Sequence, residues 1–110
     1  MPQARTEEQR PPLRVIVAFN VWRHRKAKGF SQEKLARRSD LSRNTITAIE
    51  DARDPTKSEN DVRIGTLAQI AAALELEATD LLVWDPVAMH QSGWSVEAGI
   101  QLPLVALVRT

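Results

Sequence analysis

Cysteine is absent from this sequence of 110 residues, which excludes disulfide bonds and cysteine-ligated metal sites. Long apolar runs are also absent, because the longest, 102–108, is far shorter than the roughly 20 residues that a membrane-spanning helix needs. The N-terminal residues are rich in Pro, Gln, Arg and Glu and lack the apolar core of a signal peptide. We therefore expect a cytoplasmic protein that makes no contact with a membrane.

The sequence is also poor in residues that carry catalysis. It has two histidines, His24 and His90, no cysteine, and no Gly-rich loop of the kind that cradles a phosphate. No combination of nucleophile, base and orienting group can be assembled from this set. We therefore expect a protein that is not an enzyme and that needs no cofactor.

The composition predicts one folded domain with a short appendage. Apolar residues make up 43% of the chain, which is enough for a small core, and charged residues make up 26%. The charges are unevenly distributed: residues 1–50 carry 11 Lys and Arg against 5 Asp and Glu, whereas residues 51–110 carry 4 against 9. A basic first half suits a polyanionic partner, although charge asymmetry of this size also arises without function.

The most informative segment is 31–51, SQEKLARRSDLSRNTITAIED. Ser31 and Ser42 can each cap the start of a short helix, and the chain breaks between these helices near Asp40. Five apolar side chains are spaced to form one small core between the two helices: Leu35, Ala36, Leu41, Ile46 and Ile49. The segment therefore predicts a helix-turn-helix, in which the small Ala36 allows close approach of the two helices.

This segment and its flanks resemble the phage repressor and Cro (XRE-type, lambda-repressor-like) family of helix-turn-helix DNA-binding proteins. The residues that carry the resemblance are Gly29, Phe30, Ser31, Gln32, Leu35, Ala36, Leu41, Ser42, Ile46, Ile49 and Glu50. One position departs from the family pattern, since Asp40 stands where the turn usually has Gly. Asp is among the few residues that adopt left-handed backbone angles, so we expect the turn to form at some cost.

The resemblance extends from about residue 13 to residue 83 and implies a mainly α fold. We expect a five-helix, lambda-repressor-like DNA-binding domain over residues 13–84. It would follow a flexible N-terminal arm, 1–12, and precede a C-terminal extension, 85–110. The implied partners are double-stranded DNA and a second copy of the chain.

The resemblance also implies a site. The second helix of the motif, 42–50, should enter the major groove with its N-terminal residues foremost. The residues placed for base contact are Arg43, Asn44, Thr47 and Ala48. Arg can form two hydrogen bonds with guanine and Asn two with adenine, each pair discriminating by about 1 to 3 kcal/mol. Arg43 and Asn44 are thus the predicted base readers, with a phosphate contact as the alternative for either. The other predicted phosphate contacts are Gln32, Ser42, Thr45, Arg25, Lys28 and Arg53.

The remaining helices follow from apolar spacing. The first, 13–28, has Val17, Val21 and His24 on its inward stripe, and we assign His24 a structural role. A polar loop over 51–63 separates the motif from a helix at 64–74, whose predicted core positions are Ile64, Leu67, Ile70, Ala71 and Leu74. A short fifth helix should start at Thr79 or Asp80, a region that the family often uses for dimer contacts.

Residues 85–110 lie outside the resemblance. Val87 and Met89, and then Trp94, Val96 and Ala98, alternate with polar or small residues, which is a strand pattern. The extension is therefore predicted to be a small β-ribbon. A ribbon this small needs packing partners, so it could be a dimerisation segment, a clamp on its own helical domain, or a docking segment for another protein.

Two functions follow. The first is a sequence-specific transcriptional regulator, a dimeric repressor that binds a pseudo-palindromic operator. The alternative is an antitoxin-type module, in which the helices bind DNA and the C-terminal segment binds a partner protein.

Overall fold

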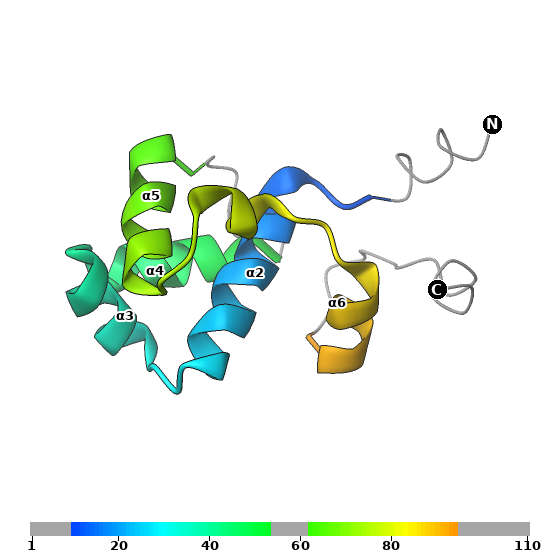
Figure 1. The fold of residues 1–110 in the computed structure, drawn as a ribbon, viewed down its shortest axis with the longest axis horizontal. Coiled ribbons are helices and arrows are strands. Elements are labelled where there is room, and N and C mark those ends of the chain that lie inside the picture. The colour runs from blue at the N-terminus through cyan, green and yellow to red at the C-terminus, as the bar shows by residue number, and fades with distance from the viewer. Residues whose placement is uncertain (1–9, 54–61, 95–110) are drawn as a thin grey trace.

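The computed structural model describes residues 10–53 and 62–94, and within these ranges the chain folds into helices and connecting turns (Figure 1). The elements are α2 (Leu13–Ala27), α3 (Gln32–Ser39), α4 (Arg43–Glu50), the 3-10 helix η1 (Asp51–Arg53), α5 (Ile64–Ala73), the 3-10 helix η2 (Ala78–Leu82) and α6 (Pro86–Ser92). The predicted mainly α fold class is confirmed, and the described part of the chain contains no strand.

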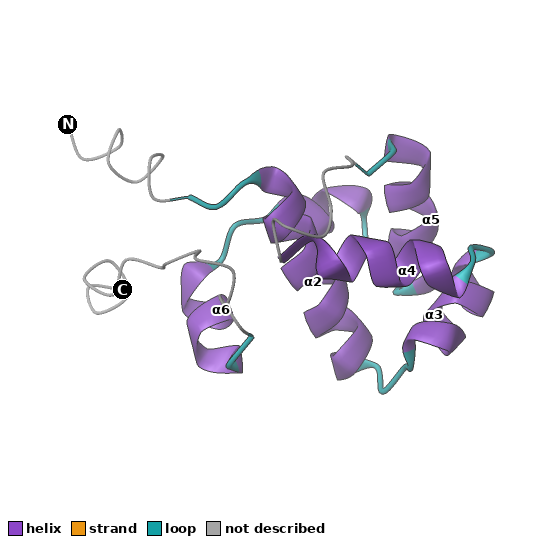
Figure 2. Cartoon of the chain, turned by 180° about the vertical axis from the view of Figure 1, so that it is seen from behind, coloured by secondary structure: helices purple, strands orange, loops and turns teal. Residues whose placement is uncertain are grey.

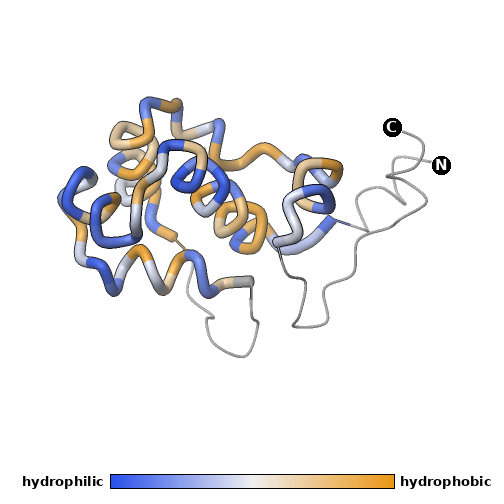
Figure 3. The backbone as a smooth tube through the Cα atoms, turned by 90° about the horizontal axis from the view of Figure 1, so that it is seen from below, coloured by the Kyte–Doolittle hydropathy of each residue, from blue (hydrophilic) through white to orange (hydrophobic). Residues whose placement is uncertain are grey.

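Helix α2 supplies side chains to both hydrophobic cores. It begins after Pro12, whose carbonyl accepts a hydrogen bond from the Val15 amide at 2.9 Å. It ends where Gly29 takes a positive φ of 73°, a conformation that favours glycine. Val17 and Val21 face the first core, and Val15 faces the second. Along the helices apolar and hydrophilic residues alternate every few positions, as they do in amphipathic helices (Figure 3).

The helix-turn-helix forms from the signals that predict it. The Ser31 hydroxyl accepts a hydrogen bond from the Lys34 amide at 3.0 Å, and the Ser42 hydroxyl accepts one from the Thr45 amide at 3.1 Å. Between the two helices Asp40 has φ 60° and ψ 40°, which confirms the left-handed conformation expected there. Both helix starts and the turn are therefore set by local interactions.

Helices α4 and α5 lie on opposite sides of the domain. In Figure 1 α5 is in front of α4, and in the reverse view of Figure 2 α4 crosses in front of α2 and α3. In Figure 2 no described helix lies in front of α4, so this side of α4 is free of other described helices. The first core lies between these layers, and its buried residues are Val17, Val21, Leu35, Ala36, Ile46, Ile49, Leu67, Ile70, Ala71, Leu74 and Leu81.

Two details of the helical prediction are corrected. Ile64 is 83% exposed, because it is the first residue of α5 and lies beyond the point where that helix meets the core. The short fifth helix is the 3-10 helix η2, and it begins at Ala78 rather than at Thr79 or Asp80. Glu77 and Asp80 form a capping box there, in which the Glu77 amide donates to the Asp80 carboxylate at 2.8 Å.

The strand predicted around Val87 and Met89 is wrong, because these residues belong to helix α6. Asp85 caps this helix by accepting a hydrogen bond from the Ala88 amide at 3.0 Å, and Pro86 occupies its first turn. Gly93 ends the helix with φ 73°. These start and stop signals outweigh an alternation that spans only three residues.

Helix α6 packs on the helical domain through a second core. The buried residues of this core are Val15, Ala18, Phe19, Ala52, Met89 and Trp94. The boundary predicted at residue 84 therefore does not separate α6 from the other helices. The predicted arm up to residue 9, most of the 51–63 loop, and the predicted β-segment over 95–110 lie outside the described residues. Within the described ranges, no helix has the length and apolar character needed to cross a membrane.

Candidate functional site

The free side of α4 presents the predicted base-reading residues. Arg43, Asn44 and Ala48 are exposed, whereas Ile46 and Ile49 on the opposite side of the helix are buried in the first core. This division follows from the helical period, which puts residues three apart on one stripe. The structure thus brings together three of the four predicted base-contact residues on one surface.

Thr47, the fourth predicted base-contact residue, is half-buried beneath this surface. Its hydroxyl donates a hydrogen bond to Gln32 Oε1 at 3.2 Å. Gln32 Nε2 in turn donates to Glu50 Oε1 at 3.1 Å. The first residue of α3 is therefore tied to two points on α4, a role that the prediction of a phosphate contact by Gln32 did not include.

Arg25, a predicted phosphate contact, is instead buried beneath the end of α4. Its Nε and Nη2 donate to the two carboxylate oxygens of Glu50 at 2.7 and 2.9 Å, and its Nη1 donates to the Phe30 carbonyl at 2.9 Å. The side chains of Arg25 and Glu50 are only 8% and 6% exposed. A buried charge persists only when it is paired and hydrogen-bonded, as both groups are here. The guanidinium is thus occupied inside the protein and is not placed to contact a phosphate.

The sequence contained a signal for this burial. Arg25 follows the buried Val21 by four residues, and Glu50 follows the buried Ile46 by four residues, so both charges continue apolar stripes. What the sequence could not supply was the pairing itself, because the two partners are 25 positions apart.

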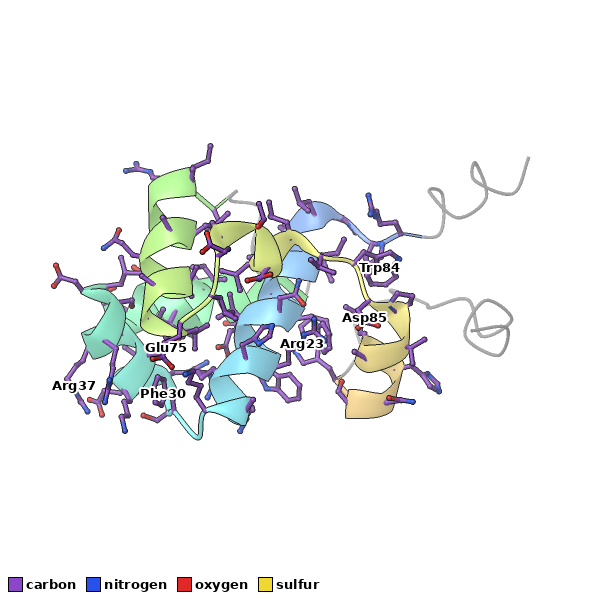
Figure 4. The ribbon with its side chains drawn as sticks, viewed as in Figure 1. Arg23, Phe30, Arg37, Glu75, Trp84 and Asp85 are labelled. Carbon is purple, nitrogen blue, oxygen red and sulfur yellow. The ribbon has the colours of Figure 1, made fainter. Side chains whose placement is uncertain are left out.

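Lys28 is also engaged within the protein. Its ammonium group forms a short ion pair with the carboxylate of Glu75. Glu75 follows α5 and lies on the near side of the domain in Figure 4, whereas α4 lies at the back in the same view (Figures 1 and 4). The hydrogen bond and the positive charge of Lys28 lower the pKa of Glu75. The structure therefore does not bring Lys28 to the exposed face of α4, where a phosphate contact would be useful.

The remaining predicted phosphate contacts surround the start and the end of α4. Ser42 and Thr45 lie at its N-terminus, and their hydroxyl oxygens are 2.9 Å apart. Ser42 is exposed, and Thr45 is half-buried. Arg53 is the last residue of η1, and its side chain lies outside the described residues. Ser42 and Thr45 thus remain beside Arg43 and Asn44 as part of one surface.

The described residues offer no metal centre. No group of three or more His, Cys, Asp or Glu side chains within 10–53 and 62–94 could hold an ion. His24 is half-buried, and burial lowers its pKa; the neighbouring Arg23 adds to this shift, and Asp80 opposes it. The structural role predicted for His24 is compatible with this position at the edge of the core.

The arrangement of an exposed α4 on a capped helix-turn-helix agrees with a family comparison. The model of the Cro/C1-type HTH DNA-binding domain matches residues 20–86. The chain belongs to the Cro/C1-type helix-turn-helix DNA-binding family. The resemblance seen in the sequence is thereby confirmed, and this DNA-binding family accords with the expectation that the chain is not an enzyme.

A curated protein and a solved structure that are similar to this Cro/C1-type domain both come from Neisseria. A "Neisseria hypothetical transcription factor" from Neisseria meningitidis serogroup B is 34% identical over 71 residues, which are 64% of this chain and 61% of that protein. The chain thus spans less than two thirds of the length of this curated relative. The crystal structure of a hypothetical transcription factor from Neisseria matches with a TM-score of 0.61 and 30% identity, covering 74% of this chain and 91% of the other.

Proposed function

We propose that this Cro/C1-type protein is a sequence-specific transcriptional regulator, which acts as a dimeric repressor on a pseudo-palindromic operator. The observation that carries the proposal is the exposure of Arg43 and Asn44 at the N-terminus of α4, the end that enters the major groove in helix-turn-helix proteins. Ala48, one turn further along, lies on the same exposed surface. Arg43 is assigned to guanine and Asn44 to adenine, and Ser42 and Thr45 to the adjacent phosphates.

The network beneath α4 supports this assignment. Base readout needs a helix that is held in one orientation, since hydrogen bonds to base edges tolerate little displacement. Arg25, Gln32 and Glu50 connect α2, α3 and α4 through hydrogen bonds of 2.7 to 3.1 Å. Thr47 is hydrogen-bonded to Gln32 in the same network. We therefore assign Thr47 two roles: it helps to hold α4 in its orientation, and it contacts a base next to those read by Arg43 and Asn44.

Two exposed apolar residues at the end of η2 support the dimer. Leu82 and Val83 are 37% and 50% exposed. The buried Asn20 side chain fixes their backbone, because its Nδ2 donates to the carbonyls of Leu81 and Val83 at 2.9 and 2.8 Å. A two-fold axis near Leu82 and Val83 would pair two copies of the chain. It would place their α4 helices in successive major grooves, roughly 34 Å apart. Repression would then follow from occlusion of a promoter.

Selection of binding sites from a random duplex pool tests the proposal. We expect a pseudo-palindrome whose half-sites are one helical turn apart, bound with an affinity that falls steeply as salt rises. Recovery of a single half-site would contradict the dimer. Salt-sensitive binding without any selected sequence would contradict base readout. Absence of binding would favour the protein-interaction function predicted as the alternative.

A further inference from the structure

Helix α6 lies almost wholly outside the family match, yet it packs where α4 ends. The match stops at Pro86, the first residue of α6. Met89 and Trp94 are 0% and 5% exposed, and they share the second core with Ala52. Ala52 belongs to η1, which follows α4 without interruption. The segment that follows the family domain therefore packs against the residues directly after α4, the helix assigned to base readout.

Trp94 reaches the polar network beneath α4. Its side chain lines a cavity of about 160 Å³ together with Trp22, Arg25, Gln32 and Glu50. Trp22 and Trp94 thus contribute to the lining of a partly open cavity beside the hydrogen-bonded charges of Arg25 and Glu50, together with the polar residues Lys26 and Asp51. The side chains of Arg25 and Glu50 are only 8% and 6% exposed beside this cavity, and hydrogen bonds between charged groups are stronger where little water reaches them.

Several contacts fix the position of Trp94. Its ring meets that of Phe19 edge to face, with centroids 5.4 Å apart, and its amide donates to the Ser92 hydroxyl at 3.0 Å. At the other end of α6, Asp85 lies 3.7 Å from the guanidinium of Arg23, between α2 and α6 (Figure 4). Helix α6 is therefore held at both ends, and Trp94 is fixed against α2.

We propose that Trp94 is a positioning residue for DNA readout, which acts by shielding the Arg25–Glu50 pair and so fixing the orientation of α4. Gln32 connects this pair to the DNA-facing surface. It donates a hydrogen bond to Glu50 and accepts one from the Thr47 hydroxyl. The inference rests on the proposed use of α4 to read bases. It extends the functional unit beyond the family domain to residue 94.

The test measures the ratio of affinities for the selected duplex and for a scrambled duplex, with the full chain. We expect Trp94→Ala to lower this ratio roughly tenfold, within the range produced by changes along a coupled network. Trp94→Phe keeps a ring beside Phe19 and should restore most of the ratio. Val15→Ala is the matched control, because Val15 is buried in the same core but does not line the cavity. It should lower the thermal midpoint and leave the ratio unchanged. All variants are compared at a temperature at which circular dichroism shows them to be folded.

A second readout follows the network itself. The Arg25 Nε–H signal in ¹H–¹⁵N spectra should be sharp in the wild type and in Val15→Ala, and broadened by solvent exchange in Trp94→Ala. The inference would be overturned if Trp94→Ala and Val15→Ala lowered the affinity ratio equally. It would also be overturned if Trp94→Ala left both the affinity ratio and the Arg25 signal unchanged. A wild-type chain that selects no sequence would instead overturn the proposed function, and the Arg25 signal still reports on the shielding in that case.

Discussion

Two charged pairs in this small domain lie in opposite surroundings. Arg25 of α2 and Glu50, the last residue of α4, are buried between these two helices, where the guanidinium donates three hydrogen bonds. Lys28 and Glu75 meet at the surface beside α5, where the Glu75 side chain is 78% exposed. The difference shows that position, rather than charge type, decides what a basic residue near a helix-turn-helix does. The buried pair fixes α4, and water screens the surface pair.

Breaking the buried pair should have the largest effect. Arg25→Ala leaves the Glu50 carboxylate buried without its charged partner, which typically costs about 3 to 5 kcal/mol in the free energy of unfolding. Urea denaturation of the purified variant measures this loss. The double variant Arg25→Met, Glu50→Leu is the matched control, and it should recover most of the stability because a packed apolar pair replaces a buried ion pair well. A loss below about 1 kcal/mol, the range of surface pairs, would contradict the importance of burial.

Changing the exposed side of α4 should affect binding and spare stability. Asn44→Ala removes the predicted adenine contact, which we expect to cost about 1 to 3 kcal/mol in affinity for the selected duplex and to relax preference at one position in each half-site. Titration of duplexes that carry each base at that position measures both quantities. Lys28→Ala is the control, since Lys28 faces Glu75 and should not alter base preference. A uniform loss over all duplexes would show that Asn44 contacts only the backbone.

The sequence predicted the helix-turn-helix residue by residue because its signals are local. Ser31, Ser42 and Asp40 act within one turn of their own positions. The buried role of Arg25 escaped prediction because its partner is distant in the sequence. The strand predicted where α6 lies is wrong because its alternation is brief, whereas the cap at Asp85 and the stop at Gly93 define a helix. Long-range pairing and competing local signals are thus the two sources of error here.

His24 lies at the edge of the core and is half-buried, unlike the buried pair of Arg25 and Glu50. Its pKa is lowered by burial and by Arg23, so the unfolded chain binds a proton more readily than the folded chain does. Stability should therefore fall as pH decreases through the ordinary histidine range, around pH 6.5, toward the lower pKa of the folded state. Urea midpoints between pH 8 and 5 measure this effect. His24→Gln should flatten the profile across that range, and an unchanged slope would assign the effect to another group.

The surface pair of Lys28 and Glu75 should produce the smallest change. Glu75→Gln removes the charge and keeps the shape, and the urea midpoint at pH 7 should fall only slightly. Because Lys28 lowers the pKa of Glu75, this contribution is present above the ordinary glutamate range and disappears as pH falls through the lowered value. Added salt should remove it as well, since screening acts strongly on exposed charges. Affinity for the selected duplex should be unchanged by Glu75→Gln, whereas a gain would mean that release of Lys28 lets it reach a phosphate after all.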